Sequence, residues 1–318
     1  MNRVPGVPAP VLTSEILAAL RSRFGNSLSE PQPLAAGEWS RAYALTVEGR
    51  ELVVRVGRYG RDHLKDEFAA RAFSNPRLPV PEVLACGEVD GLCYAVSERL
   101  HGTPLDALDA EQFTRALPSF LDTLDEIRSV DLAQTEGFGS WEPDGAAPHA
   151  SWAEYLLEIG KPRARLAGWR DALHTSPTGT ASFDQGRRRL EELAPRLPNV
   201  RDLIHGDLLN RNILVNAGTS TVSAVLDWGN SIYGDSLYDA AWLITWWSWY
   251  PQWKTVDIRA RIRERLWVGD RLPADLDERL LAYEIYIALD GIAFCAFSER
   301  WNEVETISRT VARLAASV

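Results

Sequence analysis

The first hundred residues contain four short runs in which apolar and polar side chains alternate, the pattern of half-buried β-strands. These runs are residues 42–47, 51–56, 83–86 and 92–97. Turn residues join the members of each pair, and a helical pattern over residues 62–73 lies between the pairs. We therefore predict an antiparallel β-sheet with a helix for residues 1–100.

Beyond residue 100 the apolar residues recur every three to four positions, as on the buried face of a helix. The clearest such segments are residues 105–130, 152–173, 182–197 and 282–297. Loops rich in Gly, Pro or Thr separate them. Residues 101–318 are therefore expected to be mostly helical, so that the chain is an α+β protein with two lobes, 1–100 and 101–318.

Four polar residues with a characteristic spacing lie in residues 203–235. An apolar pair precedes His205, Gly206 and Asp207; Asn212 follows five residues later, immediately before an apolar run; and Asp227 ends the strand-like run 221–226. A loop between two short strands presents Asp207 and Asn212 to one cleft, and Asp227 emerges beside Asn212.

Carboxylate and amide oxygens at this spacing suit phosphoryl transfer from a nucleotide. Mg²⁺ neutralises the phosphates while a carboxylate base orients the attacking hydroxyl group. We predict that Asp207 is the base and that Asn212 and Asp227 hold the metal. The alternative is a plain turn with unrelated loop residues. It is disfavoured because two separated elements agree in order and spacing.

Composition limits the other function classes. The 318 residues are 46% hydrophobic and 25% charged, which is ordinary for a globular protein. A net charge of -10 argues against a nucleic-acid partner, because phosphate backbones are held by Lys and Arg. The three cysteines lack metal-ligand spacing and are typical of reduced thiols. Without a signal pattern or a membrane-length apolar run, we expect a cytoplasmic protein that does not enter membranes.

Residues 228–253 contain half of the twelve tryptophans. Trp242, Trp246 and Trp249 are spaced to share one helical face, which is compatible with a packed aromatic core. They could instead wall an acceptor pocket together with Trp228, where rings stack on a sugar, base or macrocycle.

Three acidic residues are further candidates for acceptor binding. The position of Asp235 favours a role as an anchor of the helical lobe over one in substrate binding. Asp235 is nevertheless close in sequence to Asp227, so it stays a candidate. Glu284 and Asp290 lie on the late helical segment, where they contact either the acceptor or only solvent.

The His-Gly-Asp-x-x-x-x-Asn segment resembles that of the aminoglycoside phosphotransferases, which share the protein-kinase-like fold. Gly206 and Trp228 stand where protein kinases have Arg and Phe, which favours the small-molecule branch. Within the family the chain is most similar to the hygromycin B phosphotransferases. The similarity is carried by residues 78–83, 131–135, 137–139 and 234–236. The resemblance implies a β-sheet lobe with a helix, a mostly helical second lobe, and Asp207 as catalytic base.

The resemblance also implies a nucleotide site in the first lobe. The first hairpin of kinase-like folds covers the phosphates. Its loop, residues 36–41, has one Gly, so backbone N–H groups and the Ser40 hydroxyl would make the contacts. Arg55 takes the place of the nucleotide-pairing Lys, with Glu67 expected as its acidic partner. The base would border the linker residues Glu98, Arg99 and Leu100, which do not distinguish ATP from GTP.

The sequence thus predicts a monomeric enzyme that moves the γ-phosphoryl group of ATP or GTP, with Mg²⁺, to a hydroxyl group. The resemblance implies a hygromycin-like aminoglycoside or another glycosylated or nucleoside antibiotic as acceptor, in resistance or self-protection. Two alternatives stay open. One is a metabolic kinase of choline, homoserine or a sugar, and the other is a nucleotide-binding pseudokinase module.

Overall fold

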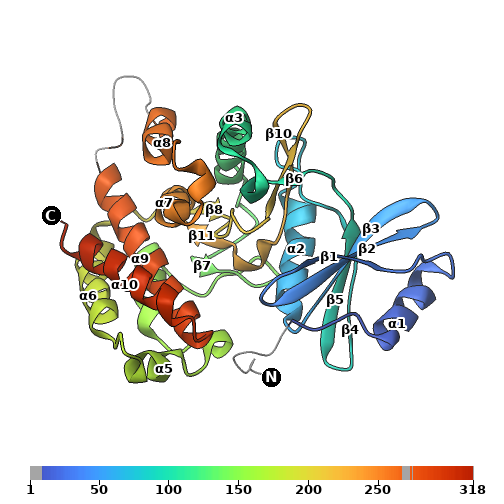
Figure 1. The fold of residues 1–318 in the computed structure, drawn as a ribbon, viewed down its shortest axis with the longest axis horizontal. Helices are drawn as coiled ribbons and strands as arrows, with labels where there is room; N and C mark the ends of the chain where they lie inside the picture. Colours follow the sequence, from blue (N-terminus) through green and yellow to red (C-terminus); the bar gives the residue numbers. More distant parts are fainter. Residues whose placement is uncertain (1–8, 267–272, 274, 318) are drawn as a thin grey trace.

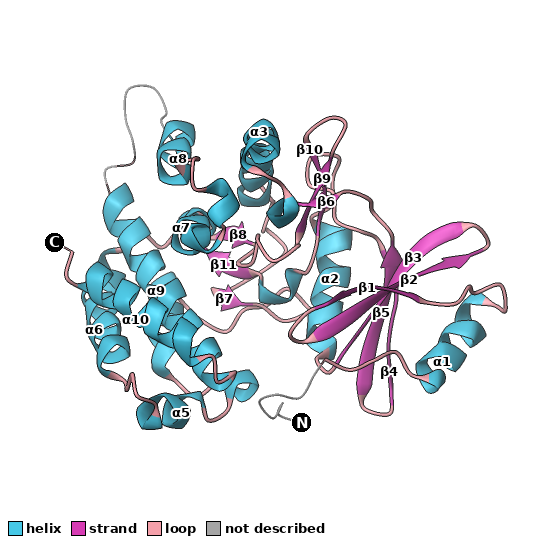
Figure 2. Cartoon of the chain, viewed as in Figure 1, coloured by secondary structure: helices cyan, strands magenta, loops and turns pink. Residues whose placement is uncertain are grey.

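The computed structural model describes residues 9–266, 273 and 275–317. A β-sheet lies at one end of the molecule and a large helical part at the other (Figures 1 and 2). The sheet has five antiparallel strands in the order β1-β2-β3-β5-β4. Its strands are β1 Gln32–Ala36, β2 Ser40–Val47, β3 Arg50–Gly57, β4 Val83–Val89 and β5 Leu92–Glu98.

The two hairpins form where the turn residues predict them. Glu48 and Gly49 have φ angles of 50° and 83°, and Asp90 and Gly91 have 52° and 74°. Two successive residues with positive φ twist the connection to match the strands of a tight hairpin. The β2–β3 register therefore pairs every residue from Ser40 with Gly57 to Val47 with Arg50.

One face of the sheet is closed by helix α1, Ser14–Phe24, whose N-cap Thr13 accepts a hydrogen bond from the Ile16 N–H. Ile16 and Leu20 are fully buried against strand residues such as Val54 and Val56. This small cluster is the hydrophobic core of the sheet end.

Helix α2, Gly60–Ala72, lies between the sheet and the helical part (Figure 1). Its buried Ala69, with Phe73 just after it, packs in the larger core of the helical part rather than in the core of the sheet. The boundary between the lobes at residue 100 stays a prediction.

The helical part is built from eight α-helices in the described residues. They are α3 Ala110–Arg128, α4 Trp152–Leu156, α5 Trp169–Thr175, α6 Ala181–Leu193, α7 Leu237–Trp246, α8 Ile258–Leu266, α9 Leu276–Phe297 and α10 Trp301–Ala315. Short 3₁₀ turns join them: η1 Leu105–Ala107, η2 Leu157–Gly160, η3 Ala164–Leu166, η4 Ala194–Arg196, η5 Trp228–Asn230, η6 Trp247–Trp249 and η7 Pro251–Trp253.

Helix α9 runs through the middle of this part (Figure 1). It is the one helix among the described residues that is long and apolar enough to cross a membrane. However, 83% of its apolar 18-residue stretch is buried within the protein. It is therefore the central core helix, packed against α5, α6, α7 and α10.

The continuous helix predicted over residues 152–173 is wrong. The segment is broken into α4, η2, η3 and α5. Pro162 lacks the N–H that a helix needs, and Gly168 adopts a left-handed φ of 80° before α5 begins. Both residues interrupt an apolar rhythm that continues past them.

Two small sheets carry the polar segment identified in the sequence. One has the order β10-β9-β6 and the other β7-β11-β8. Their strands are β6 Thr103–Pro104, β7 Gly139–Ser140, β8 Asp202–Ile204, β9 Ile213–Asn216, β10 Thr221–Val225 and β11 Ile232–Gly234. The predicted strands around residues 203–204, 213–215 and 221–226 are confirmed. The α+β fold, with a sheet lobe and a helical lobe, is confirmed as well.

Candidate active site

The loop between β8 and β9 carries Asp207, which is partly exposed, and Asn212, which is buried. Gly206 has a φ of 75°, and a Cβ atom at this position would lie 2.9 Å from the Asn230 carbonyl oxygen. Asn210 and Arg211 also have positive φ angles, 58° and 72°. Left-handed backbone at non-glycine residues is costly and is held in place only by its surroundings, which is common at functional sites.

Buried polar groups hold this loop in place. The Asp239 carboxylate accepts hydrogen bonds from the His205 N–H at 2.9 Å and the Gly206 N–H at 2.8 Å. His205 is fully buried. Its Nε2 donates to the Leu226 carbonyl at 2.9 Å, and its Nδ1 accepts from the Asp207 N–H at 3.2 Å. Burial lowers the pKa of His205 to about 4, so the ring is neutral and orients the loop.

Asp207 is half-buried at the bottom of this turn. Its carboxylate accepts a hydrogen bond from the Asn210 side-chain amide at 2.9 Å and a longer one from that of Asn230 at 3.4 Å. Burial raises the pKa of Asp207 to about 7. A carboxylate with a pKa near neutrality is suited to accept a proton at physiological pH.

Asn212 and Asp227 lie side by side across the β9–β10 pair. The Asn212 side-chain amide donates to the Asp207 carbonyl at 2.7 Å, so its Oδ1 is left for another partner. The Asn212 carbonyl accepts from the Leu226 N–H at 2.7 Å, which places Asp227 next to it. Asp227 has a φ of 62°, and its side chain is 41% exposed.

This donor set fits magnesium. Mg²⁺ prefers oxygen ligands and keeps places for substrate phosphates, so a carboxylate and a carboxamide are enough protein ligands. Within the described residues there is no group of three His, Cys, Asp or Glu side chains that could form a complete protein cage. Asn212 and Asp227 are thus suited to a metal that arrives with a nucleotide.

Arg55 on β3 lies beside the same carboxylate. Its Nη1 is 3.2 Å from an Asp227 oxygen, and its Nη2 pairs with Asp66 on α2. The Nδ1 of the neutral His63 ring is 3.4 Å from the Arg55 Nε. Burial opposes ionisation of Asp227, but the Arg55 guanidinium holds the pKa of Asp227 below its usual range.

The predicted Arg55–Glu67 ion pair is wrong, because the partner of Arg55 is Asp66. Asp66 also accepts a hydrogen bond from the Trp228 N–H at 2.8 Å and so joins α2 to the turn that follows Asp227. Neighbouring helix residues point about 100° apart, so only one of the two acids can face Arg55. The amphipathic pattern of this charged helix is too weak to show which one.

Sequence reasoning missed Lys65, the residue that fixes α2 to the segment after Asp227. Lys65 is fully buried, and its Nζ donates to the carbonyls of Gly229 at 3.0 Å and Ser231 at 2.7 Å. The Nζ also lies 4.3 Å from the ring centre of Trp141. Burial lowers the pKa of Lys65 to about 7. A Lys in the middle of a short polar helix gives no sequence signal of such burial.

The nucleotide-binding residues implied by the resemblance lie where the loop between β1 and β2 enters β2, on β3 and α2, and at the end of β5 and just after it. In the first hairpin loop the Gly37 N–H donates to the Ser40 carbonyl at 2.9 Å. In the linker, the N–H groups of Glu98 and Arg99 are already bonded to the Glu82 and Glu51 carbonyls.

Leu100 differs from its two linker neighbours. Its peptide N–H and C=O make no hydrogen bond to any described residue. The Arg99 side chain is also engaged, with its Nη1 3.1 Å from Glu51. Leu100 is therefore the linker residue whose backbone groups have no partner among the described residues.

Trp228 does not line an acceptor pocket, and that prediction is corrected. The ring is fully buried, with its centre 4.8 Å from that of His205 and 5.9 Å from that of Phe73. Its Nε1 donates to the Val225 carbonyl at 3.4 Å. Trp228 packs against His205 and so supports the loop that carries Asp207.

The other tryptophans form a ladder on α7 and η6. The centres of the Trp242 and Trp246 rings are 5.9 Å apart, and those of Trp246 and Trp249 are 5.8 Å apart. Trp242 and Trp246 are half-buried, and Trp249 is 41% exposed. The Nε1 atoms of Trp242 and Trp246 have no hydrogen-bond partner in the described part of the chain. Trp246 packs on Gly291 of α9, where a Cβ atom would lie 2.5 Å from its ring.

The three acidic candidates have different surroundings. Asp235 is fully buried, bonds to both Nε and Nη2 of Arg279 at 2.7 and 2.8 Å, and accepts from the Tyr283 hydroxyl at 2.6 Å. It is therefore a structural anchor, and its assignment to substrate binding is corrected. Glu284 is 6% exposed and pairs with Arg259 at 2.6 Å.

Asp290 is more exposed than the other two acidic candidates. It is paired with Arg163 from the segment before η3. Its side chain is 33% exposed. Glu284 lies about a turn and a half earlier on α9, towards α8, so the structure does not bring the two acids together.

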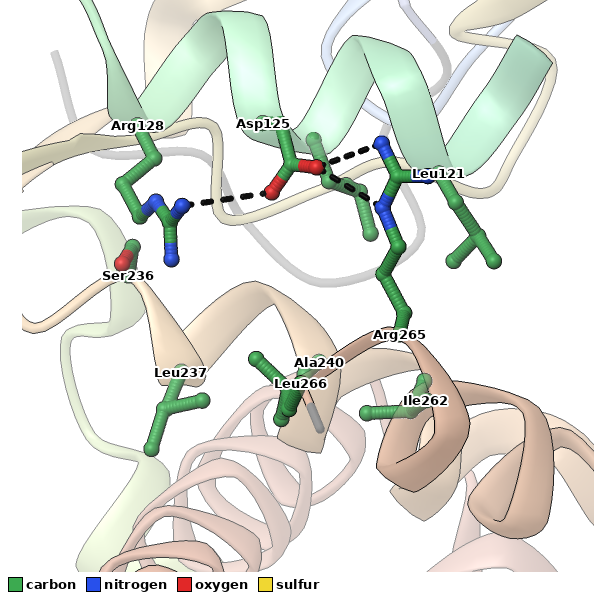
Figure 3. A pocket seen from close by; sticks show the side chains of 10 residues that line it. Leu121, Asp125, Arg128, Ser236, Leu237, Ala240, Ile262, Arg265 and Leu266 are labelled. Atoms are coloured by element: carbon green, nitrogen blue, oxygen red, sulfur yellow. Dashed lines mark hydrogen bonds and ion pairs between the residues drawn. The ribbon is translucent and has the colours of Figure 1, made fainter. Parts of the chain in front are cut away.

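Two cavities lie in the helical part. A small one of about 50 Å³ lies between α3, α7 and α8, with an apolar floor of Leu237, Ala240 and Ile262 (Figure 3). Arg265 and Asp125 pair across its mouth. A cavity of about 450 Å³ beside η6 is bordered by Trp247, Tyr250 and Glu284. The smaller cavity has room for little more than water.

Comparison with known proteins identifies the class. The model of the phosphotransferase enzyme family matches residues 30–280. The chain belongs to this family, and it is an enzyme that transfers a phosphoryl group to a hydroxyl group. The arrangement of Asp207, Asn212 and Asp227 agrees with that class.

Individual proteins of this family are similar to most of the chain. The chain is 32% identical over 285 residues to the hygromycin-B 4-O-kinase of Escherichia coli, which covers 89% of this chain and 80% of that protein. A thermostable variant of aminoglycoside phosphotransferase APH(4)-Ia, in ternary complex with AMP-PNP and hygromycin B, superposes with a TM-score of 0.83 and 28% identity over 96% of this chain and 100% of the other. Another structure of APH(4)-Ia gives a TM-score of 0.84 and 27% identity over 96% and 99%.

Proposed function

We propose that this enzyme transfers the γ-phosphoryl group of ATP or GTP to a hydroxyl group of hygromycin B or a closely related aminoglycoside. The observation that carries the proposal is the convergence of Asp207, Asn212 and Asp227 at the β8–β9 and β10 ends, with Arg55 beside them. The relative that is 32% identical is a hygromycin-B 4-O-kinase, which supports the acceptor class.

In the proposed reaction Asp207 accepts the proton of the acceptor hydroxyl and aims its oxygen at the γ-phosphorus. The hydroxyl oxygen forms a bond to phosphorus as the bond to the bridging β,γ-oxygen breaks, and the nucleoside diphosphate leaves. Most of the acceleration in such reactions comes from positioning and electrostatic stabilisation rather than from covalent chemistry. No phosphorylated enzyme is needed.

Asn212 and Asp227 would hold Mg²⁺, which when bound neutralises phosphate charge. Arg55 is 3.2 Å from Asp227, so its guanidinium can add to the positive charge at the same place. Asp66 and His63 hold the guanidinium group of Arg55 in one orientation. The hairpin loop with Ser40 would cover the phosphates, and the Leu100 backbone would border the base.

The acceptor would lie between Asp207 and the ladder of Trp242 and Trp246. Apolar sugar faces stack on half-buried indoles such as those of Trp242 and Trp246. Asp290 on α9, which is 33% exposed, would offer a carboxylate to an ammonium group of the acceptor. The net charge of -10 favours a cationic ligand and disfavours nucleic acid.

We further propose that the enzyme works as a monomer in the cytoplasm, in antibiotic resistance or self-protection. The three cysteines are unpaired, which is usual in a reducing compartment.

A coupled assay of nucleoside-diphosphate release tests the acceptor. ATP and GTP are supplied in parallel against hygromycin B, other aminoglycosides, nucleoside antibiotics, choline and homoserine. We expect release that depends on hygromycin B or a near relative. Turnover with choline or homoserine alone would make the protein a metabolic kinase, and nucleotide binding without any turnover would make it a binding module.

A further inference from the structure

The loop between β1 and β2 contacts the C-terminal end of helix α9. The Trp39 ring stacks on that of Phe297, with centres 6.1 Å apart and planes at 25°. It also meets the edge of Phe294 at 6.2 Å and 60°. Both geometries are favourable arrangements for aromatic pairs. A loop of the sheet lobe is thus attached to the central helix of the helical lobe.

An ion pair accompanies this aromatic contact. The Nη2 of Arg300, just after α9, lies 2.9 Å from an oxygen of Glu38. The Arg300 guanidinium also lies over the Phe294 ring, 5.2 Å from its centre. The two charged side chains are 41% and 28% exposed. Contacts this exposed are weak enough to break and re-form without unfolding either lobe.

Trp39 has two further neighbours, Arg165 and Tyr59. The guanidinium of Arg165 lies 5.4 Å from the Trp39 ring centre and 4.1 Å from that of Tyr59. Arg165 is on η3 of the helical part and pairs with Asp62 of α2. Trp39 therefore has neighbours both at the start of α2, through Tyr59, and in the helical part.

The position of these contacts matters for the reaction. Trp39 immediately precedes Ser40 in the loop that would cover the nucleotide phosphates, and the loop is tightened by the Gly37 N–H bond to the Ser40 carbonyl. The partner helix α9 carries Asp290 and supports Trp246 through Gly291. One rigid helix therefore joins the acceptor side of the cleft to the phosphate loop.

We propose that Glu38, Trp39, Phe294, Phe297 and Arg300 form a clasp that holds the phosphate loop closed over the bound nucleotide. The clasp opens once in each cycle to release the nucleoside diphosphate. Trp39 is a positioning residue: it acts through the backbone of the loop and touches neither reacting atom. The proposal rests on the proposed function only for the presence of a nucleotide in the cleft.

The test is the dissociation rate of fluorescently labelled ADP with Mg²⁺ from the full-length protein, measured by stopped flow without any acceptor. Trp39→Ala should release ADP at least about tenfold faster than the wild type, because an aromatic anchor and its packing are lost. Trp39→Phe keeps a ring against Phe297 and should stay within about threefold. The steady-state KM for the nucleotide should rise with the release rate in Trp39→Ala, with a smaller change in kcat.

A charge exchange provides the second variant, in case Trp39→Ala does not fold. Glu38→Arg and Arg300→Glu should each speed ADP release, and the double variant should restore slow release. Arg309→Ala, which removes the exposed Glu305 pair of α10 at 3.1 Å, is the matched control and should release ADP at the wild-type rate.

Two results would overturn the clasp. One is a wild-type release rate in folded Trp39→Ala, and the other is a double charge variant no slower than its single parents. If the wild-type protein bound no nucleotide at all, the proposed function itself would fail, and the clasp with it. The acceptor identity does not enter this experiment, so a wrong acceptor leaves the result interpretable.

Discussion

Among single residues, Asp207 has the surroundings expected of a general base. It receives hydrogen bonds from Asn210 and Asn230, and its main-chain carbonyl holds Asn212. We expect Asp207→Asn, which keeps the size of the side chain, to lower kcat by about 10² to 10⁴. The Kd for the nucleotide, measured by calorimetry, should change by less than about threefold. Wild-type turnover, or the loss of nucleotide binding together with turnover, would contradict this role.

The rate should also depend on pH through Asp207. The base works in its ionised form, and burial raises the pKa of Asp207 to about 7. The rate at limiting acceptor should therefore rise with pH and level off above about pH 7 to 8. Asn210→Ala removes the hydrogen bond of 2.9 Å that stabilises the carboxylate, so the midpoint should move to higher pH. A rate that is flat from pH 5 to 8, or a midpoint that moves to lower pH in Asn210→Ala, would contradict the assignment.

Asp235 provides the contrasting case of a structural acid. Removing its charge in Asp235→Asn disrupts a buried pair with Arg279 and a hydrogen bond from Tyr283. We expect the free energy of unfolding to fall by about 3 kcal/mol in urea denaturation. The KM for the acceptor should be unchanged in the folded fraction at low temperature. A raised KM at wild-type stability would return Asp235 to the acceptor site.

Sequence reasoning succeeded at residues whose roles depend on local spacing. Asp207 follows β8, Asn212 precedes β9 and Asp227 follows β10, and these strands are three to five residues long, so the meeting place of the three residues could be predicted. The partner of Arg55 could not, because α2 is charged on several faces and its orientation depends on the helical lobe. Trp228 was also misplaced, since an indole after a metal-binding Asp can face either the cleft or the core.

Among the elements, α2 is the one that connects both lobes to the site. Lys65 binds two carbonyls of the turn after Asp227, and Asp66 binds both Arg55 and the Trp228 N–H. This helix is held in position by buried contacts. Its contribution to the site could not be predicted from the sequence, because a buried Lys and an exposed Lys look alike in a polar helix. The broken segment 152–173 shows the opposite difficulty, where an apolar rhythm continued through residues that end a helix.

Lys65→Met tests the role of α2. The substitution keeps an unbranched side chain but leaves the Gly229 and Ser231 carbonyls without their buried donor. We expect a loss of about 2 to 4 kcal/mol in the free energy of unfolding. We also expect at least about a tenfold fall in kcat, because the turn that carries Asp227 is released. Lys161→Met is the matched control: its side chain is 66% exposed, so both quantities should stay close to wild type. Equal behaviour of the two variants would refute the role.

For the whole molecule, the sheet lobe and the helical lobe meet along α2, the catalytic loop and the clasp at Trp39. The α+β class was predictable, because the change from alternating to helical periodicity occurs near residue 100. The inclusion of Ala69 and Phe73 in the larger core was not, since it depends on contacts more than a hundred residues away. The clasp between Trp39 and Phe297 is similarly invisible in the sequence.

The acceptor is the central assignment for the molecule as a whole. The most direct measurement is the mass of hygromycin B after incubation with the enzyme, Mg²⁺ and ATP, and in parallel with GTP, with Asp207→Asn as the blank. We predict that the antibiotic gains the mass of one phosphoryl group with wild-type enzyme and none with Asp207→Asn. Unmodified hygromycin B beside active turnover of another acceptor would contradict the proposed function.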